Sequence, residues 1–99
     1  MKGIFHLAFP VTDLAKTREF YGATLGCVEG RSTDRWIDID FFGHQISAHL
    51  VDSLDDADPT NPVDGDAIPV RHFGAILSVS DWETIAAKLR TAGTPFVLE

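Results

Sequence analysis

The chain opens with a strand pattern that is followed at once by a helix pattern. Apolar residues alternate with small or polar ones, among them His6, between residues 5 and 11, which is the two-residue period of a β-strand. Asp13 stands where a helix N-cap is expected, and Gly26 supplies the backbone freedom of a helix stop. The sequence therefore predicts a strand followed by a short amphipathic helix. The apolar stripe of this helix consists of Leu14, Tyr21 and Leu25.

Three further strands are predicted between residues 27 and 50. Residues 27–31 suit a short strand, and strict alternation over 36–41 is typical of a half-buried one. One face of that strand carries Ile37, Ile39 and Phe41, and the other carries Trp36, Asp38 and Asp40. Gly43 then permits a hairpin into HQISAHL, in which Gln45, Ser47 and His49 alternate with Ile46, Ala48 and Leu50. If the apolar set packs under the helix, the polar set lines the opposite, concave side of the sheet.

Residues 52–69 have a different composition from the segments on either side. They contain three prolines and six aspartates, with no lysine or arginine and little to bury. We expect a solvated, mobile linker here. The order of its aspartates does not match an EF-hand loop.

The opening pattern is repeated after this linker. RHFGAILSVSDWETIAAKLRTAG again reads as a strand with a histidine and then a helix, for which Ser80 and Glu83 form a capping-box pattern and Gly93 a stop. The two copies make an internal repeat of about 68 residues. TPFVLE then indicates the start of another strand.

Composition narrows the classes of partner. The 99 residues suit one domain, and no apolar run approaches the ~20 residues that span a bilayer. The formal charge of −7, from 8 Lys and Arg against 15 Asp and Glu, argues against nucleic acid. The single cysteine, Cys27, excludes an internal disulfide and suits a reducing compartment, so we expect a cytoplasmic protein.

The two strand–helix units and the polar-faced strand HQISAHL resemble the vicinal oxygen chelate superfamily, which includes glyoxalase I, bleomycin-resistance proteins and extradiol dioxygenases. The resemblance implies an α+β fold of paired βαβββ modules whose mixed sheet curls around a cleft. Residues 1–51 would form the first module, 52–69 the linker and 70–99 an incomplete second module within one domain. A half-complete second module leaves unpaired strand edges, so we expect a homodimer or a paired-module assembly. The resemblance also implies a continuation that brings the chain to about 130–140 residues, an ordinary single-domain length.

The same resemblance implies a set of site residues. Metal-bearing members hold a divalent ion, for which His6, His49 and His72 are the candidate ligands here, although His72 lies two residues from the expected register. Fe, Ni, Mn, Co and Zn are the candidate metals. Gln45, Ser47 and Trp36 are the candidate substrate-binding residues.

Several of these residues also have ordinary structural explanations. Asp38 and Asp40 are either general bases in the cleft or, as we expect, solvated strand residues. Trp36 and Phe42 either stack a substrate ring or serve as packing residues. His44, beside Gly43, is expected to be a solvated turn residue.

Two function classes follow. In the first, the protein is a metal-dependent enzyme, a dioxygenase or a glyoxalase-type isomerase or lyase, that chelates two neighbouring oxygens of a small substrate. In the second, it is a metal-free module that binds or sequesters a small molecule. The scaffold alone does not decide between them.

Overall fold

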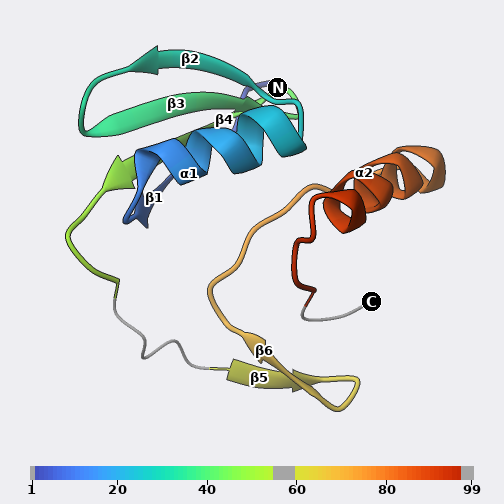
Figure 1. The fold of residues 1–99 in the computed structure, drawn as a ribbon. Coiled ribbons are helices and arrows are strands. Elements are labelled where there is room, and N and C mark those ends of the chain that lie inside the picture. The colour runs from blue at the N-terminus through green and yellow to red at the C-terminus, as the bar shows by residue number, and fades with distance from the viewer. Residues whose placement is uncertain (1, 55–59, 97–99) are drawn as a thin grey trace.

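The computed structural model describes residues 2–54 and 60–96, as Figure 1 shows. The first half contains β1 (His6–Val11), α1 (Leu14–Arg18), η1 (Glu19–Thr24), β2 (Val28–Ser32), β3 (Trp36–Phe41) and β4 (His44–Leu50). The second half contains β5 (Thr60–Val63), β6 (Asp66–Pro69) and α2 (Val79–Thr91). The segment η1 continues α1 with π-helical hydrogen bonds, so the two form one continuous helical stretch.

The first four strands form one mixed sheet in the order β1-β4-β3-β2. β1 runs parallel to β4, whereas β3 is antiparallel to both of its neighbours. A parallel pair needs a crossover connection, and the α1–η1 helix leads the chain into β2 on the way to β4. The predicted α+β class and the first βαβββ unit are confirmed.

The turn from β1 into α1 is built as the sequence predicts. Asp13 caps the helix, and its Oδ1 accepts a hydrogen bond of 2.9 Å from the backbone N–H of Lys16. The buried Thr17 hydroxyl donates to the Asp13 carbonyl at 2.7 Å. Gly26 ends the stretch with a φ of +77°, a left-handed conformation that glycine adopts without steric cost.

The core lies between the sheet and this helix. Its buried centre is formed by Ile37, Ile39 and Ile46, with Ala48 also buried. Partly buried side chains pack against that centre: Leu7, Phe9, Leu14, Tyr21, Cys27 and Phe41. The strict alternation in β3 and β4 therefore has the expected outcome, since the isoleucines face the helix and the polar residues between them face the other way.

Residues 60–69 do not form the linker that their composition predicted. They form a β5–β6 hairpin whose turn, Asp64-Gly65, has φ values of +51° and +88°. Two left-handed residues in succession match the right-handed twist of a two-strand hairpin, and Asp-Gly is a strong signal for this turn. The local turn signal thus prevailed over the composition. Residues 55–59, which belong to the same expected linker, lie outside the described residues.

The second copy of the repeat departs from its prediction. Residues 70–78 carry no strand, and residues 94–96 do not begin one, whereas the rest of TPFVLE lies outside the described residues. The N-cap of α2 is Ser78 rather than Ser80, because the Ser78 hydroxyl accepts from the Asp81 N–H. Gly93, with a φ of +74°, ends the helix as expected.

The missing strand has a physical reason. A strand is stabilised by backbone hydrogen bonds to a neighbouring strand. In the described part of the chain, no strand pairs with residues 70–78. Ile76 in this segment is fully exposed. No helix in the described part of the chain is long and apolar enough to cross a membrane.

Candidate functional site

One face of the four-strand sheet gathers the polar side chains of three strands. The register places His6 of β1 beside Gln45 of β4, and it places Asp38 of β3 beside Ser47. Trp36 and His49 form the next pair along the sheet. We call this surface the polar face; it consists of His6, Trp36, Asp38, Asp40, Gln45, Ser47 and His49.

The centre of the polar face is a buried acid–hydroxyl pair. Asp38 is 6% exposed and Ser47 is 3% exposed. The Ser47 hydroxyl donates to Oδ1 of Asp38 across 2.5 Å, a short charge-assisted hydrogen bond. The expectation that Asp38 is solvated is therefore wrong, whereas Asp40 is exposed as expected and accepts from the Gly43 N–H. Asp38 lies between Ser47 of β4 and the bulged part of β2, whose Arg31 reaches it, whereas Asp40 lies nearer the exposed β3–β4 turn.

Arg31 of β2 also reaches the polar face, which the sequence interpretation missed. A bulge in β2 brings it to this side, so that its Nε lies 3.6 Å from Oδ2 of Asp38 and its guanidinium lies over Trp36, 5.8 Å from the ring centroid. Gly30 beside it was the available signal, since an isolated glycine within a strand often marks a bulge.

His6 and Gln45 are joined at one end of the polar face. His6 Nδ1 lies 2.8 Å from Gln45 Oε1. Because that oxygen can only accept, Nδ1 is the donor of this hydrogen bond, and Nε2 is the ring nitrogen left for another partner. This is the arrangement in which an imidazole is oriented for use as a base, an acceptor or a metal ligand.

The three candidate metal ligands do not converge. His49 pairs with Pro10, four positions along β1 from His6, which separates the two histidines by roughly 13 Å at ~3.3 Å per residue. His72 follows β6 and bonds through Nδ1 to the Pro69 carbonyl at 2.7 Å. Two imidazoles on one ion must have their nitrogens within about 4 Å of each other. Within residues 2–54 and 60–96, no three His, Cys, Asp or Glu side chains are grouped to hold an ion.

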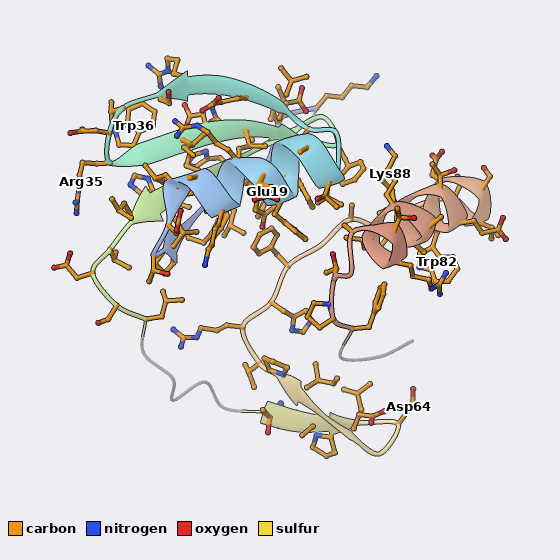
Figure 2. All side chains as sticks on the ribbon, in the orientation of Figure 1. Glu19, Arg35, Trp36, Asp64, Trp82 and Lys88 are labelled. Atoms are coloured by element: carbon orange, nitrogen blue, oxygen red, sulfur yellow. The ribbon has the colours of Figure 1, made fainter. Side chains whose placement is uncertain are left out.

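A hollow lies away from the polar face. It has a volume of about 1100 Å³ and is bordered by the helical stretch, β1, the segment 70–77 and α2. Phe73 packs against Phe9 and Phe41 in it, with ring centroids 5.2 and 5.9 Å apart. Its lining is mostly apolar and aromatic and includes His72 and Trp82. In Figure 2, Trp82 on α2 and Trp36 at the far end of β3 lie in well-separated parts of the molecule.

Two ionisable groups near this hollow have raised pKa values. Burial raises the pKa of the Tyr21 hydroxyl, and the nearby Cys27 adds to the effect. Burial also raises the pKa of the Cys27 thiol, with a further contribution from the Asp40 carboxylate. Both groups therefore stay protonated near neutral pH, and Cys27 lacks the lowered pKa of a reactive thiol.

Comparison with known proteins agrees with this architecture. The model of the Glyoxalase/Bleomycin resistance protein/Dioxygenase superfamily matches residues 3–99. A glyoxalase/bleomycin resistance protein/dioxygenase from Alicyclobacillus acidocaldarius has 33% sequence identity and a TM-score of 0.76. That match covers 95% of this chain and 66% of the other, so this chain spans just under two thirds of its relative.

A second solved structure is similar in fold alone. It is the integron cassette protein HFX_CASS4 from the mobile metagenome of the Halifax Harbour sewage outfall, with 22% identity and a TM-score of 0.67 over 94% of this chain and 72% of the other. No curated protein matches the chain. The family match over nearly the whole sequence, together with the βαβββ unit, assigns the family. This chain belongs to the Glyoxalase/Bleomycin resistance protein/Dioxygenase superfamily.

Proposed function

We propose that the protein binds a small oxygen-bearing molecule on the polar face of the β1–β4 sheet. One observation carries this proposal: the hydrogen-bonding side chains of three strands meet on the face opposite the helix, and they are ordered by one another. The apolar side chains of the same strands pack in the core. The polar side chains between them lie on the other face, where His6, Gln45, Trp36 and His49 are at least partly exposed and can meet a ligand.

The chemistry of this face suits hydroxyl and carbonyl oxygens. The Asp38–Ser47 pair supplies a buried acceptor, and His6, whose ring is held by Gln45, lies two positions along the strands from this pair. A ligand with two neighbouring oxygens would meet both an acceptor and an orienting group on one surface. Trp36, half-buried at the other end of the face, adds an aromatic surface.

The two tryptophans of the chain give a direct test. Trp36 belongs to the polar face and Trp82 to the apolar hollow, so the two indole N–H signals in a nitrogen–proton correlation spectrum report separately on the two places. Titration with catechol, a neutral ring with two adjacent hydroxyls, should move the Trp36 signal and leave that of Trp82 in place. Trp36→Phe and Trp82→Phe assign the signals. Movement of the Trp82 signal alone, or of neither, would contradict the proposal.

A metal-dependent dioxygenase or lyase is the second candidate, and one observation favours it. The Nδ1–Gln45 hydrogen bond leaves Nε2 of His6 free to bind an ion, as in metal ligands whose second nitrogen is held by a neighbouring oxygen. His49 lies four positions along the sheet from His6, and the described residues hold no group of three His, Cys, Asp or Glu side chains around one ion. We therefore assign no chemical step to a metal.

Metal analysis of the purified protein separates the two candidates. Wild-type protein that retains near-stoichiometric Fe, Ni, Mn, Co or Zn, together with His6→Ala protein that has lost it, would support the metal-dependent enzyme. His44→Ala is the matched control, because His44 is an exposed histidine at the start of β4. Equal metal content in all three proteins would remove His6 from the ligand set and leave the metal-free module.

We also propose that two copies pair. β1 and β2 end the sheet, and in the described part of the chain neither has a second strand neighbour. Open strand edges favour association. Light scattering at micromolar concentration should give twice the mass of one chain; a single-chain mass would contradict pairing.

A further inference from the structure

The β2 bulge changes the direction of one arginine. Glu29 pairs with Ile39 and Ser32 pairs with Ile37, so Gly30 and Arg31 together oppose the single residue Asp38. In a regular strand Arg31 would share a face with Glu29, which points toward the helix and binds Arg18 there at 2.8 Å. The bulge instead turns Arg31 onto the polar face.

On this face, the Arg31 side chain contacts both Asp38 and Trp36. Its Nε lies 3.6 Å from Oδ2 of Asp38, and its guanidinium carbon lies 5.8 Å from the Trp36 ring centroid. Asp38 is itself fixed by the hydrogen bond from Ser47. A buried carboxylate needs such partners, because an unpaired buried charge is costly. Asp38, Ser47 and Trp36 thus act as positioning residues for the guanidinium.

The rest of the guanidinium faces outward. The Arg31 side chain is 84% exposed, although its Nε edge is directed at Asp38. A guanidinium carries five N–H donors in a planar fork that matches the two oxygens of a carboxylate. His49, whose ring lies 6.4 Å from that of Trp36, adds another N–H donor beside the same indole.

The surrounding charge selects the kind of anion. The chain has a formal charge of −7, and a buried carboxylate lies directly behind Arg31. A doubly charged phosphate would meet strong repulsion with only one fixed guanidinium to offset it. A singly charged carboxylate adds one negative charge rather than two beside the Arg31–Asp38 pair, and it matches the planar fork.

We propose that Arg31 is a specificity residue that binds the carboxylate group of a singly charged organic substrate on the polar face. This inference rests on the proposed function and extends it by naming the class of ligand. The ordinary alternative is a surface ion pair between Arg31 and Asp38 that contributes little to any binding.

A pair of matched probes tests it. 3,4-Dihydroxybenzoate and its neutral amide, 3,4-dihydroxybenzamide, share the same diol ring and differ only in the carboxylate. Dissociation constants are measured from the Trp36 indole signal at constant ionic strength. We expect wild-type protein to bind the acid about tenfold more tightly than the amide, since a charge-assisted pair contributes about 1.4 kcal/mol or more.

Variants locate the effect. Arg31→Gln should remove the preference for the acid, measured as the ratio of the two dissociation constants, while Arg31→Lys should keep only part of that preference because lysine lacks the fork. Arg18→Gln is the matched control, because Arg18 is also paired with an acid, Glu29 of β2, but on the helix side of the sheet. It should keep the full preference.

The outcomes separate the two proposals. Equal binding of acid and amide by wild-type protein, or a preference that survives in Arg31→Gln, would overturn the role of Arg31 and leave the proposed function intact. If neither probe moves the Trp36 signal, the proposed function itself fails, and the inference fails with it. Phosphate competing as well as benzoate for the acid site would overturn the choice of a carboxylate.

Discussion

The two halves of the chain contain similar sequence signals but differ in how well they are packed. In residues 6–51, the α1–η1 stretch covers a four-strand sheet and buries Ile37, Ile39, Ile46 and Ala48. In residues 60–96, Ala86 is the sole buried apolar residue among those described, and Trp82 of α2 is 54% exposed. The radius of gyration, 14.6 Å, exceeds the roughly 12.6 Å typical of a compact chain of this length.

The difference shows that a sequence pattern for a helix can form its structure locally, whereas a pattern for a strand also requires a neighbouring strand. A capped helix satisfies its own backbone, so α2 forms with Ser78 as its cap and Gly93 as its stop. A strand must find a partner, so residues 70–78 stay irregular although their sequence resembles that of β1. The first half supplies partners for its strands, and it is there that the polar face is assembled.

The sharpest test of the comparison is a pair of identical substitutions. Ile37 is completely buried at the centre of the sheet, whereas Ile76 in the second half is fully exposed. Ile37→Ala should lower the free energy of unfolding by about 2–5 kcal/mol through lost burial and a residual cavity. Ile76→Ala should change it by less than about 0.5 kcal/mol. Urea unfolding measures both; comparable losses would mean that the second half is packed as firmly as the first.

A smaller effect is expected from the centre of the polar face. Ser47→Ala removes the donor to Oδ1 of the buried Asp38 and should cost about 1–3 kcal/mol of unfolding free energy. Ser53→Ala is the control, because Ser53 is exposed. Urea unfolding at pH 7 measures both. If Ser47→Ala is as stable as wild type, the Asp38–Ser47 bond contributes nothing to the stability of the sheet.

The N-terminus of α2 offers a test in the loosely packed half. Ser78→Ala removes the side chain that caps the helix and should cost about 1 kcal/mol of helix stability. Ser80→Ala should cost less, because Ser80 lies within the helix rather than at its cap. Amide hydrogen exchange across α2 reports on both variants. A larger loss of protection in Ser80→Ala than in Ser78→Ala would mean that Ser80, the residue that the sequence pattern indicated, caps the helix.

The smallest expected effect is on pH dependence. Burial raises the pKa of Cys27 above its ordinary 9.0, so the folded chain holds this proton more firmly than the unfolded chain. Stability from this group is therefore fully present below pH 9.0 and is lost as pH rises through the folded pKa. Between pH 7.5 and pH 10, the urea midpoint should fall by a smaller amount in Cys27→Ser than in wild type. An equal fall would assign the change to other groups, such as Tyr21.

Much of the first half was predictable from local signals. The alternation in β3 and β4 identified which residues face the helix, and the side chain of Asp13 marked the start of α1. Asp64-Gly65 carried an equally local turn signal, but the acidic composition around it led to the prediction of a linker. The capping of α2 was misplaced by two residues because Ser78 and Ser80 both stand ahead of an acidic residue at a suitable spacing.

The candidate site was only partly predictable. Gln45, Ser47 and Trp36 were expected on one face, and the register places them there with His6 and His49. The burial of Asp38 was not expected, since it depends on the neighbours that β2 and β4 provide on either side of β3. The direction of Arg31 was not expected either, because a bulge reverses the two-residue period on which face assignments depend.

By itself, the sequence determined the helix with its Asp13 cap, the four strands of the first unit and the separation of their apolar and polar faces. These features arise from interactions between residues close together in the chain, so the local pattern carries them. The tertiary structure alone decided which polar side chains meet: His6 bonds to Gln45, Ser47 bonds to a buried Asp38, and Arg31 joins them across a bulge. It also placed His49 four positions along the sheet from His6. Such contacts depend on strand register and on the partners of each strand, which a pattern read along one chain does not contain.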